Sequence, residues 1–351
     1  MNSLSIIKIL LPLITSFIVG LSIFPYIIKW LTNMKMWKKK SVAKSIDGRD
    51  AVISASLHND ENKNTPRSGG VGVILSVIIT LIILRILPIL DANHFTLAVN
   101  FLSRNQTWIP LVSLLLAGII GFIDDYSVTH DMGNYIGKGL DLKYRLIGVA
   151  AIGAMSSYWL FFKNDVSGLY LPYFGTINIG YWFLPLAMTI YIFIYSGGVI
   201  DGVDGLSGGV FSVIFTSLGI VSLINSQNDI AALCFAVSGA LLAFLWFNIP
   251  PAKVFLSESG STGLTVLLTT VAFYTNTVWL LPIIAFPLIM TSLSVIIQLL
   301  SKKFRNGKKV FLVAPIHHHF EALGNPKYNV TMKYWIFSFI CGLTGVVLAS
   351  L

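Results

Sequence analysis

Long apolar runs alternate with short polar connections along all 351 residues of the chain. A helix needs about 20 predominantly apolar residues to cross the hydrocarbon core of a bilayer. The runs therefore predict an all-α integral membrane protein with about ten transmembrane helices, organised as a single polytopic membrane domain over residues 1–351. The predicted spans are 5–31, 69–90, 107–123, 145–162, 180–198, 209–225, 229–249, 262–275, 277–300 and 334–351.

Several connections have features of their own. Residues 33–68 are largely polar and are predicted to form a mobile loop, and residues 301–333 form a second long loop that carries three histidines. The segment 163–180 alternates around a glycine and is predicted to form a small hairpin. Within the ninth span, Pro287 predicts a kink, because proline removes a backbone hydrogen bond and crowds the preceding turn.

The distribution of charge predicts the orientation. Ten spans place the odd-numbered connections on one side, and these connections hold most of the 24 Lys and Arg residues. Basic loops stay in the cytoplasm, so we expect a cytoplasmic active-site cleft and both termini outside. The net charge of +9 is then a consequence of topology, and a nucleic-acid partner is not expected. Only 11% of the residues are charged, against about 25% in soluble domains, which excludes a soluble protein.

Acidic residues gather at span ends on the same side, where topology does not require them. Asp124 and Asp125 close the third span, and Asp201 and Asp204 lie in a glycine-rich connection. Adjacent carboxylates are tolerated beside a divalent cation or basic partners, and such pairing can produce a general base. The alternatives are a solvated helix end for the first pair and a flexible turn for the second.

Glu258 and the histidines complete the candidate chemistry. Glu258 follows Pro250-Pro251 and suits Mg²⁺, which prefers hard oxygen ligands, although a helix-capping acid explains it equally well. The consecutive His317, His318 and His319 cannot easily converge on one metal, so we interpret them as phosphate or nucleotide contacts rather than as a polar turn. Together with basic residues such as Lys138, the pattern predicts phosphoryl transfer between a soluble donor and a lipid acceptor.

Several motifs make the chain similar to a known family. Together they resemble the bacterial phospho-N-acetylmuramoyl-pentapeptide transferases, within the wider family of polyprenyl-phosphate N-acetylhexosamine-1-phosphate transferases, over essentially the whole chain. The motifs of the wider family are Phe122-Ile-Asp-Asp125, Asp201-Gly-Val-Asp-Gly-Leu206 and Val254-Phe255 with Gly260-Ser261, and the more specific ones are Pro315-Ile-His-His-His-Phe-Glu321, Lys138-Gly-Leu140 and Thr65-Pro66.

The resemblance implies a reaction and a location. UDP-N-acetylmuramoyl-pentapeptide would donate its phospho-sugar to undecaprenyl phosphate in a Mg²⁺-dependent step, giving lipid I and UMP for peptidoglycan synthesis. The enzyme would lie in the bacterial plasma membrane, with the lipid bilayer as its surroundings and a homodimer as its possible assembly.

The resemblance also implies roles for single residues. Asp124 and Asp125 match the catalytic pair, with Asp124 deprotonating the lipid phosphate, and Asp201 matches an acid of the nucleotide and catalytic site. Glu258 occupies the position of the metal ligand, with Asp201 beside it. The remaining matches are catalytic His317 and His318, and substrate-binding Lys138, Asp204, Asn248, Phe255 (stacking on uracil) and His319.

Four departures from the family pattern bear on activity. Leu256-Ser257-Glu258 stands where Met-Gly-Asp is expected, and Glu extends the metal ligand by one methylene. Gly198 replaces an expected Asn, Val128 an expected Lys, and Arg67-Ser68 an expected Thr-Met. Two alternatives therefore stay open: a related transferase that uses another UDP-N-acetylhexosamine, and a catalytically weak paralogue that acts as a binding or scaffold protein.

Overall fold

A computed structural model describes residues 3–37, 64–103, 106–133 and 139–351. Most of the predicted mobile loop over 33–68, together with Lys138, lies outside these residues. The long helices are α1 (Ser3–Asn33), α3 (Gly70–Leu90), α5 (Trp108–Thr129), α6 (Leu142–Lys163), α7 (Phe183–Tyr195), α8 (Leu206–Ile224), α9 (Asn228–Asn248), α10 (Ser257–Tyr274), α12 (Phe286–Phe304) and α14 (Lys327–Ala349). The short ones are α4 (His94–Val99), η1 (Gly180–Trp182), η2 (Ser196–Ile200), η3 (Val278–Leu280), α11 (Leu281–Ile284) and α13 (Ile316–Ala322).

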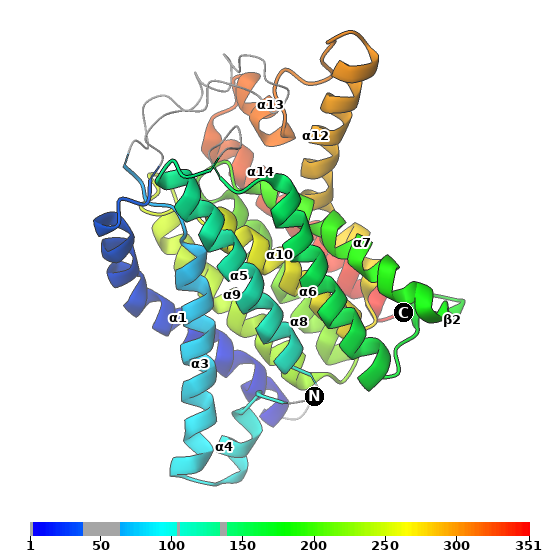
Figure 1. Ribbon diagram of the computed structural model, residues 1–351. Helices are drawn as coiled ribbons and strands as arrows, with labels where there is room; N and C mark the ends of the chain where they lie inside the picture. The colour runs from blue at the N-terminus through cyan, green and yellow to red at the C-terminus, as the bar shows by residue number, and fades with distance from the viewer. Residues whose placement is uncertain (1–2, 38–63, 104–105, 134–138) are drawn as a thin grey trace.

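The all-α membrane fold is confirmed. Within the described residues, nine helical segments are long and apolar enough to cross a membrane. The predicted eighth span, 262–275, is not one of them and corresponds to the C-terminal part of α10 and its cap. Figure 1 shows α10 in the middle of the bundle, and every α10 residue except Glu258 is buried.

The composition of α10 suits a helix that neighbouring helices shield from lipid. Its threonine hydroxyls donate to carbonyl oxygens one turn earlier, as Thr265 does to Ser261 at 2.7 Å and Thr269 to Thr265 at 2.9 Å. A helix surrounded by protein needs no apolar surface of its own, because the neighbouring helices face the lipid. The Ser-, Thr- and Gly-rich sequence therefore reflects protein contacts, since small residues let helices approach closely in membranes.

Two local predictions can be compared with the structure. The hairpin is confirmed: β1 (Gly168–Leu171) pairs antiparallel with β2 (Gly175–Asn178). The predicted kink at Pro287 is a break instead, because α11 ends at Ile284 and α12 begins at Phe286, with Pro287 in its first turn. Proline is well tolerated there, since the first backbone N–H groups of a helix have no partner inside the helix.

Two glycines bring α3 and α5 against the start of α10. A Cβ added at Gly70 would overlap the backbone of Gly260, and one added at Gly121 would overlap the backbone of Glu258 and Ser259. These contacts of backbone on backbone place the end of α5 beside the first turn of α10. In Figure 1, α13 lies at the top of the molecule and both termini lie toward the other end.

Candidate active site

Four carboxylates gather around the first turn of α10. Asp124 and Asp125 come from α5, Asp201 follows η2, and Glu258 belongs to α10 itself. The first two are almost completely buried, at 3% and 0% exposure. Buried carboxylates need hydrogen bonds or positive partners, and the structure supplies both.

Asp125 binds four groups at once. Its Oδ2 accepts from the Ser68 hydroxyl at 2.9 Å and from the Ser259 N–H at 3.0 Å. Its Oδ1 accepts from the Glu258 N–H at 3.3 Å and lies 3.4 Å from Nε of Arg67. The carboxylate therefore ties α5 to the segment before α3 and to the start of α10. Arg67 and Ser68, which depart from the family pattern, are both partners of this aspartate.

Asp201 completes the cap of α10. Its Oδ2 accepts from the Ser257 N–H and its Oδ1 from the Ser207 hydroxyl, both at 2.6 Å. Loss of water around the carboxyl raises the pKa of Asp201 above its ordinary value, and these two hydrogen bonds oppose the rise. Together with Asp125, it accepts from three successive N–H groups at a helix N-terminus, where the helix dipole favours negative charge.

Arg145 links the other two carboxylates. Its guanidinium lies 3.2 Å from Oε1 of Glu258 and 3.7 Å from Oδ2 of Asp124. Asp124 also accepts from the Leu140 N–H at 2.7 Å, and Glu258 accepts from the Thr262 hydroxyl at 3.2 Å. The acids thus form two pairs, one capping α10 and one sharing an arginine.

Asn248 holds together the two loops that border these acids. It is 1% exposed, its Oδ1 accepts from the Gly205 N–H at 2.9 Å, and its Nδ2 donates to the Val254 carbonyl at 2.7 Å. Asp204 accepts from the Ala252 N–H at 3.2 Å, across the same two loops. The half-buried Phe255 pairs through its backbone with the segment before α3, donating to the Pro66 carbonyl at 2.9 Å.

Two of the three histidines face the aspartate loop. The Nε2 atoms of His317 and His318 both crowd the position that a Cβ on Gly202 would take, next to Asp201. His318 lies with its Nδ1 3.3 Å from Oε2 of the buried Glu321. The contact with this carboxylate holds the ring of His318 in one orientation, with Nε2 directed at the loop.

His319 faces away from that pair. Its Nδ1 accepts from the Leu312 N–H at 3.2 Å, and its ring packs edge-on against Phe311. The loop before α13 is fastened by Gln298 of α12, whose Oε1 accepts from the N–H groups of Val310 and Phe311 and whose Nε2 donates to the Phe311 carbonyl. The histidine segment is therefore positioned by a buried polar face of α12.

Three of these residues were not predicted as part of the site. Arg145 stands at the start of a span on the basic side, which was the signal available for it. Glu321 stands three residues after His318, a spacing that faces it on a helix. Gln298 was a single amide within an apolar run, and such a residue needs a polar partner inside a membrane.

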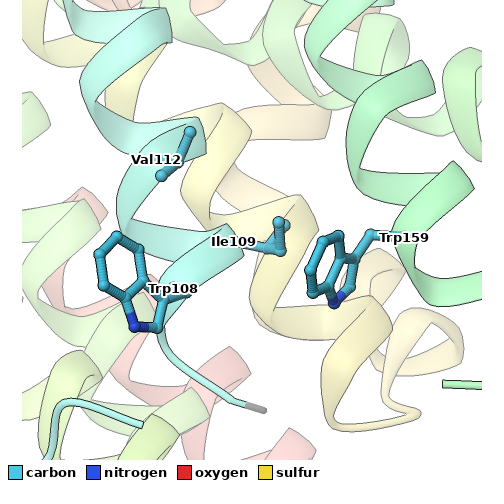
Figure 2. A pocket seen from close by; sticks show the side chains of 4 residues that line it. All are labelled: Trp108, Ile109, Val112 and Trp159. Carbon is cyan, nitrogen blue, oxygen red and sulfur yellow. The ribbon is translucent and has the colours of Figure 1, made fainter. Parts of the chain in front are cut away.

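An apolar pocket of about 330 Å³ lies elsewhere. Figure 2 shows its lining, which is Trp108, Ile109 and Val112 from α5 and Trp159 from α6. Ile109 and Asp125 are 16 residues apart on one helix, or about 24 Å along its axis at 1.5 Å per residue. The pocket therefore belongs to the opposite end of the bundle and is not part of the carboxylate cluster.

The oxygen donors are chemically suited to a hard divalent cation. No group of three or more His, Cys, Asp and Glu residues in the described part of the chain is arranged to hold a metal ion. Mg²⁺ needs fewer protein ligands, because it usually takes one or two carboxylates with water and substrate phosphates. Asp124 and Glu258 provide two carboxylates that already share one cationic group, Arg145. The predicted second ligand, Asp201, already uses one oxygen for the cap of α10 and the other for the Ser207 hydroxyl.

Fold and site together define a membrane-embedded transferase. Carboxylates, arginines and histidines meet at one end of a helical bundle. These are the side chains that bind and position phosphoryl groups and their cations. Residues 107–276 match the family described as Glycosyl transferase family 4. The chain belongs to the family of phospho-N-acetylmuramoyl-pentapeptide-transferases, as its similarity to individual members establishes.

Three relatives illustrate the similarity, and each carries the name phospho-N-acetylmuramoyl-pentapeptide-transferase. The protein of Geobacillus sp. is 30% identical, with 96% of each chain covered. That of Francisella philomiragia is 31% identical, covering 97% of this chain and 92% of the relative. That of Thermodesulfovibrio yellowstonii is 30% identical, covering 98% and 93%. The similarity extends over nearly the whole length, so it includes every part of the site described above.

Proposed function

We propose that the chain transfers phospho-N-acetylmuramoyl-pentapeptide from its UDP conjugate to undecaprenyl phosphate. A phosphate oxygen of the lipid would attack the sugar-linked phosphorus, the bond to the bridging oxygen would break, and UMP would leave, giving lipid I. The observation that carries this proposal is the meeting of Asp124, Asp201 and Glu258 with His317 and His318 at one end of the bundle. The names of the relatives supply the transferred group, phospho-N-acetylmuramoyl-pentapeptide.

Asp124 is the member of the acidic pair best placed to act as a base. Its Oδ2 lies 3.7 Å from Arg145, beyond hydrogen-bonding distance, so it can accept the proton of the lipid phosphate. Asp125 is engaged by four donors and instead fixes the first turn of α10. Arg145 is suited to the negative charge of the diphosphate, because a guanidinium binds phosphate through paired donors.

Mg²⁺ is the proposed cofactor. Glu258 would hold it, with Asp201 as the ligand expected from the family and Asp124 as the carboxylate that shares Arg145 with Glu258. When bound, the cation neutralises charge on the diphosphate. His317 and His318 would contact the nucleotide phosphates from across Gly202, with Glu321 holding the ring of His318 in place.

The other predicted contacts concern the substrate. Phe255 would stack on the uracil, and Lys138 and His319 would contact phosphate or sugar. Asp204 and Asn248 would act indirectly, since both bind backbone groups of the loops around the site. The proposed active site faces the cytoplasm, where the UDP-linked donor is soluble, and the proposed location is the bacterial plasma membrane.

Release of UMP tests the proposal. The purified protein is mixed with Mg²⁺, undecaprenyl phosphate and UDP-N-acetylmuramoyl-pentapeptide, and UMP is measured against a control without lipid. We expect lipid-dependent UMP that stops on addition of EDTA and falls about 10²–10⁴-fold in Asp124→Asn, the range of a lost general base. UMP from UDP-N-acetylglucosamine in place of the pentapeptide donor would favour the related transferase. No UMP from either donor, with donor binding retained, would favour the binding or scaffold protein.

A further inference from the structure

The connection between α6 and α7 contains the β1–β2 hairpin and has an unusual composition. Residues 166–182 include no Asp, Glu, Lys or Arg but five aromatic residues. The nearest charges on its N-terminal side are Lys163 and Asp165, and none follows until Asp201. A connection surrounded by water would ordinarily be rich in charged and polar residues, so its surroundings need an explanation.

The aromatic side chains point outward. Tyr173 is 99% exposed, Phe174 80%, Trp182 76% and Tyr181 73%. Tyr170 and Ile177 add further exposed apolar surface on the strands. Exposed apolar side chains gathered in one short element mark an interaction site.

The hairpin is held firmly against the bundle on its other side. Val166, Leu169 and Ile179 pack against the hydrophobic core. The ring of Tyr181 lies 5.2 Å from that of Phe161 in α6. The strands pair in register from Gly168 with Asn178 to Leu171 with Gly175. The exposed aromatic residues therefore belong to a paired hairpin that packs on the bundle, rather than to an irregular loop.

The position of the hairpin identifies its surroundings. It begins five residues after the end of one membrane-crossing helix, at Lys163, and ends just before the next crossing segment, which starts at Gly180. It therefore lies at the level where two spans leave the membrane, and Figure 1 shows it at the edge of the bundle. Tyr and Trp are the residues enriched at this level, because their rings are apolar and their polar tips reach water.

We propose that the β1–β2 hairpin is a membrane-interface anchor whose turn, Tyr173 and Phe174, inserts among the lipid headgroups and upper acyl chains beside the bundle. The strand edges keep unpaired backbone groups, which exclude the hydrocarbon core but not the hydrated interface. The anchor lies at the end of the bundle away from the carboxylate cluster. It holds α6 and α7 at a fixed depth, and α6 carries Arg145 in its first turn.

A fluorescent label at the turn tests this directly. Cys234 and Cys341 are replaced by Ala, and an environment-sensitive dye is attached at Tyr173→Cys in the full chain. The labelled protein is reconstituted into phosphatidylcholine vesicles with or without bromine on the acyl chains. Asp165→Cys is the matched control, because it is also exposed and lies in the same connection. Phe193→Cys on the exposed side of α7 is the reference for full contact with lipid.

The expected result is that the dye at Tyr173→Cys emits at shorter wavelength than the dye at Asp165→Cys. It should lose much of its emission in brominated vesicles, as the Phe193→Cys reference does, and resist quenching by aqueous iodide. Emission quenched by iodide and unaffected by bromine would overturn the proposal in favour of a water-exposed hairpin. Protection from both quenchers would overturn it in favour of a second copy or another protein covering the hairpin.

Discussion

Replacing Asp125 by asparagine tests whether this residue of the acidic pair stabilises the fold, acts in catalysis, or does both. The change keeps the size of the side chain but removes its charge and turns one acceptor oxygen into an NH₂ donor. The least costly orientation leaves the remaining oxygen toward Ser68 and Ser259, whose bonds are shorter, at 2.9 and 3.0 Å. The NH₂ group then meets the Glu258 N–H and the Arg67 guanidinium, which are donors themselves.

The cost follows from those two lost acceptors. A buried donor left without a partner costs about 1–3 kcal/mol. Arg67 is 22% exposed and recovers part of its loss from water, so we expect a total of about 2–4 kcal/mol. At roughly 2–4 °C per kcal/mol, the apparent melting temperature should fall by about 4–16 °C.

Asp124→Asn is the matched control, one residue earlier on the same helix. Its remaining oxygen can keep the 2.7 Å bond from the Leu140 N–H, and the 3.7 Å contact with Arg145 is too long for a hydrogen bond. Removing this buried charge also relieves its desolvation, so we expect a stability change of about 1 kcal/mol or less. Both variants should lose UMP release, but Asp125→Asn should also melt earlier.

The measurement is the melting temperature by intrinsic fluorescence, in one detergent or nanodisc, beside the UMP assay for each variant. A melting temperature of Asp125→Asn equal to that of the wild type, with activity lost, would refute the capping argument. In that case Asp125 would be acting on the substrate or the cation, as the family resemblance implies.

Three further predictions follow from the site. Gln298→Leu removes three hydrogen bonds to the loop before α13, so the backbone amides of residues 310 and 311 should exchange with deuterium faster, as measured by mass spectrometry. Unchanged exchange would argue that Gln298 does not hold this loop. Glu321→Gln loosens the ring of His318, which contacts the nucleotide phosphates, so in the UMP assay the KM for the donor should rise about 5-fold, as expected for about 1 kcal/mol of lost hydrogen bonding. The change should add little to the rise in His318→Ala. Glu258→Asp should move the Mg²⁺ optimum of UMP release, because a side chain shorter by one methylene must hold the same cation; an unmoved optimum would count against Glu258 as a ligand.

The positions of the helices could be predicted from the sequence because the preference of each side chain for lipid or water is a property of that residue and does not depend on its neighbours. Nine of the predicted spans correspond to described helical segments that are long and apolar enough to cross a membrane, and a hairpin within 163–180 was also expected. A helix over 262–275 was predicted as well and corresponds to α10, but its place as a shielded central helix was not predicted. Whether a helix faces lipid or protein depends on its neighbours, and no local pattern contains them.

The acids and histidines of the site could be singled out one by one, because charged and polar residues are costly at a membrane boundary. Which partner each of these residues contacts, and therefore which role it has, could not be predicted. Asp124 and Asp125 are adjacent in the sequence, yet one faces Arg145 and the other caps α10. Three consecutive histidines likewise separate into a pair beside Gly202 and a third, His319, that binds the loop at Leu312.

By itself, then, the sequence determined an all-α membrane protein, the residue types available for chemistry and the family to which they belong. Only the tertiary structure decided which of those residues share a partner. Arg145 reaches Glu258 across more than 100 positions, and Asp125 reaches Ser259 across a similar separation. The second contact arises because Gly121 lets α5 touch the backbone of α10 at Glu258 and Ser259. The physical reason is that contact across the bundle is set by how closely helices approach, whereas sequence patterns record only the surroundings that each helix prefers.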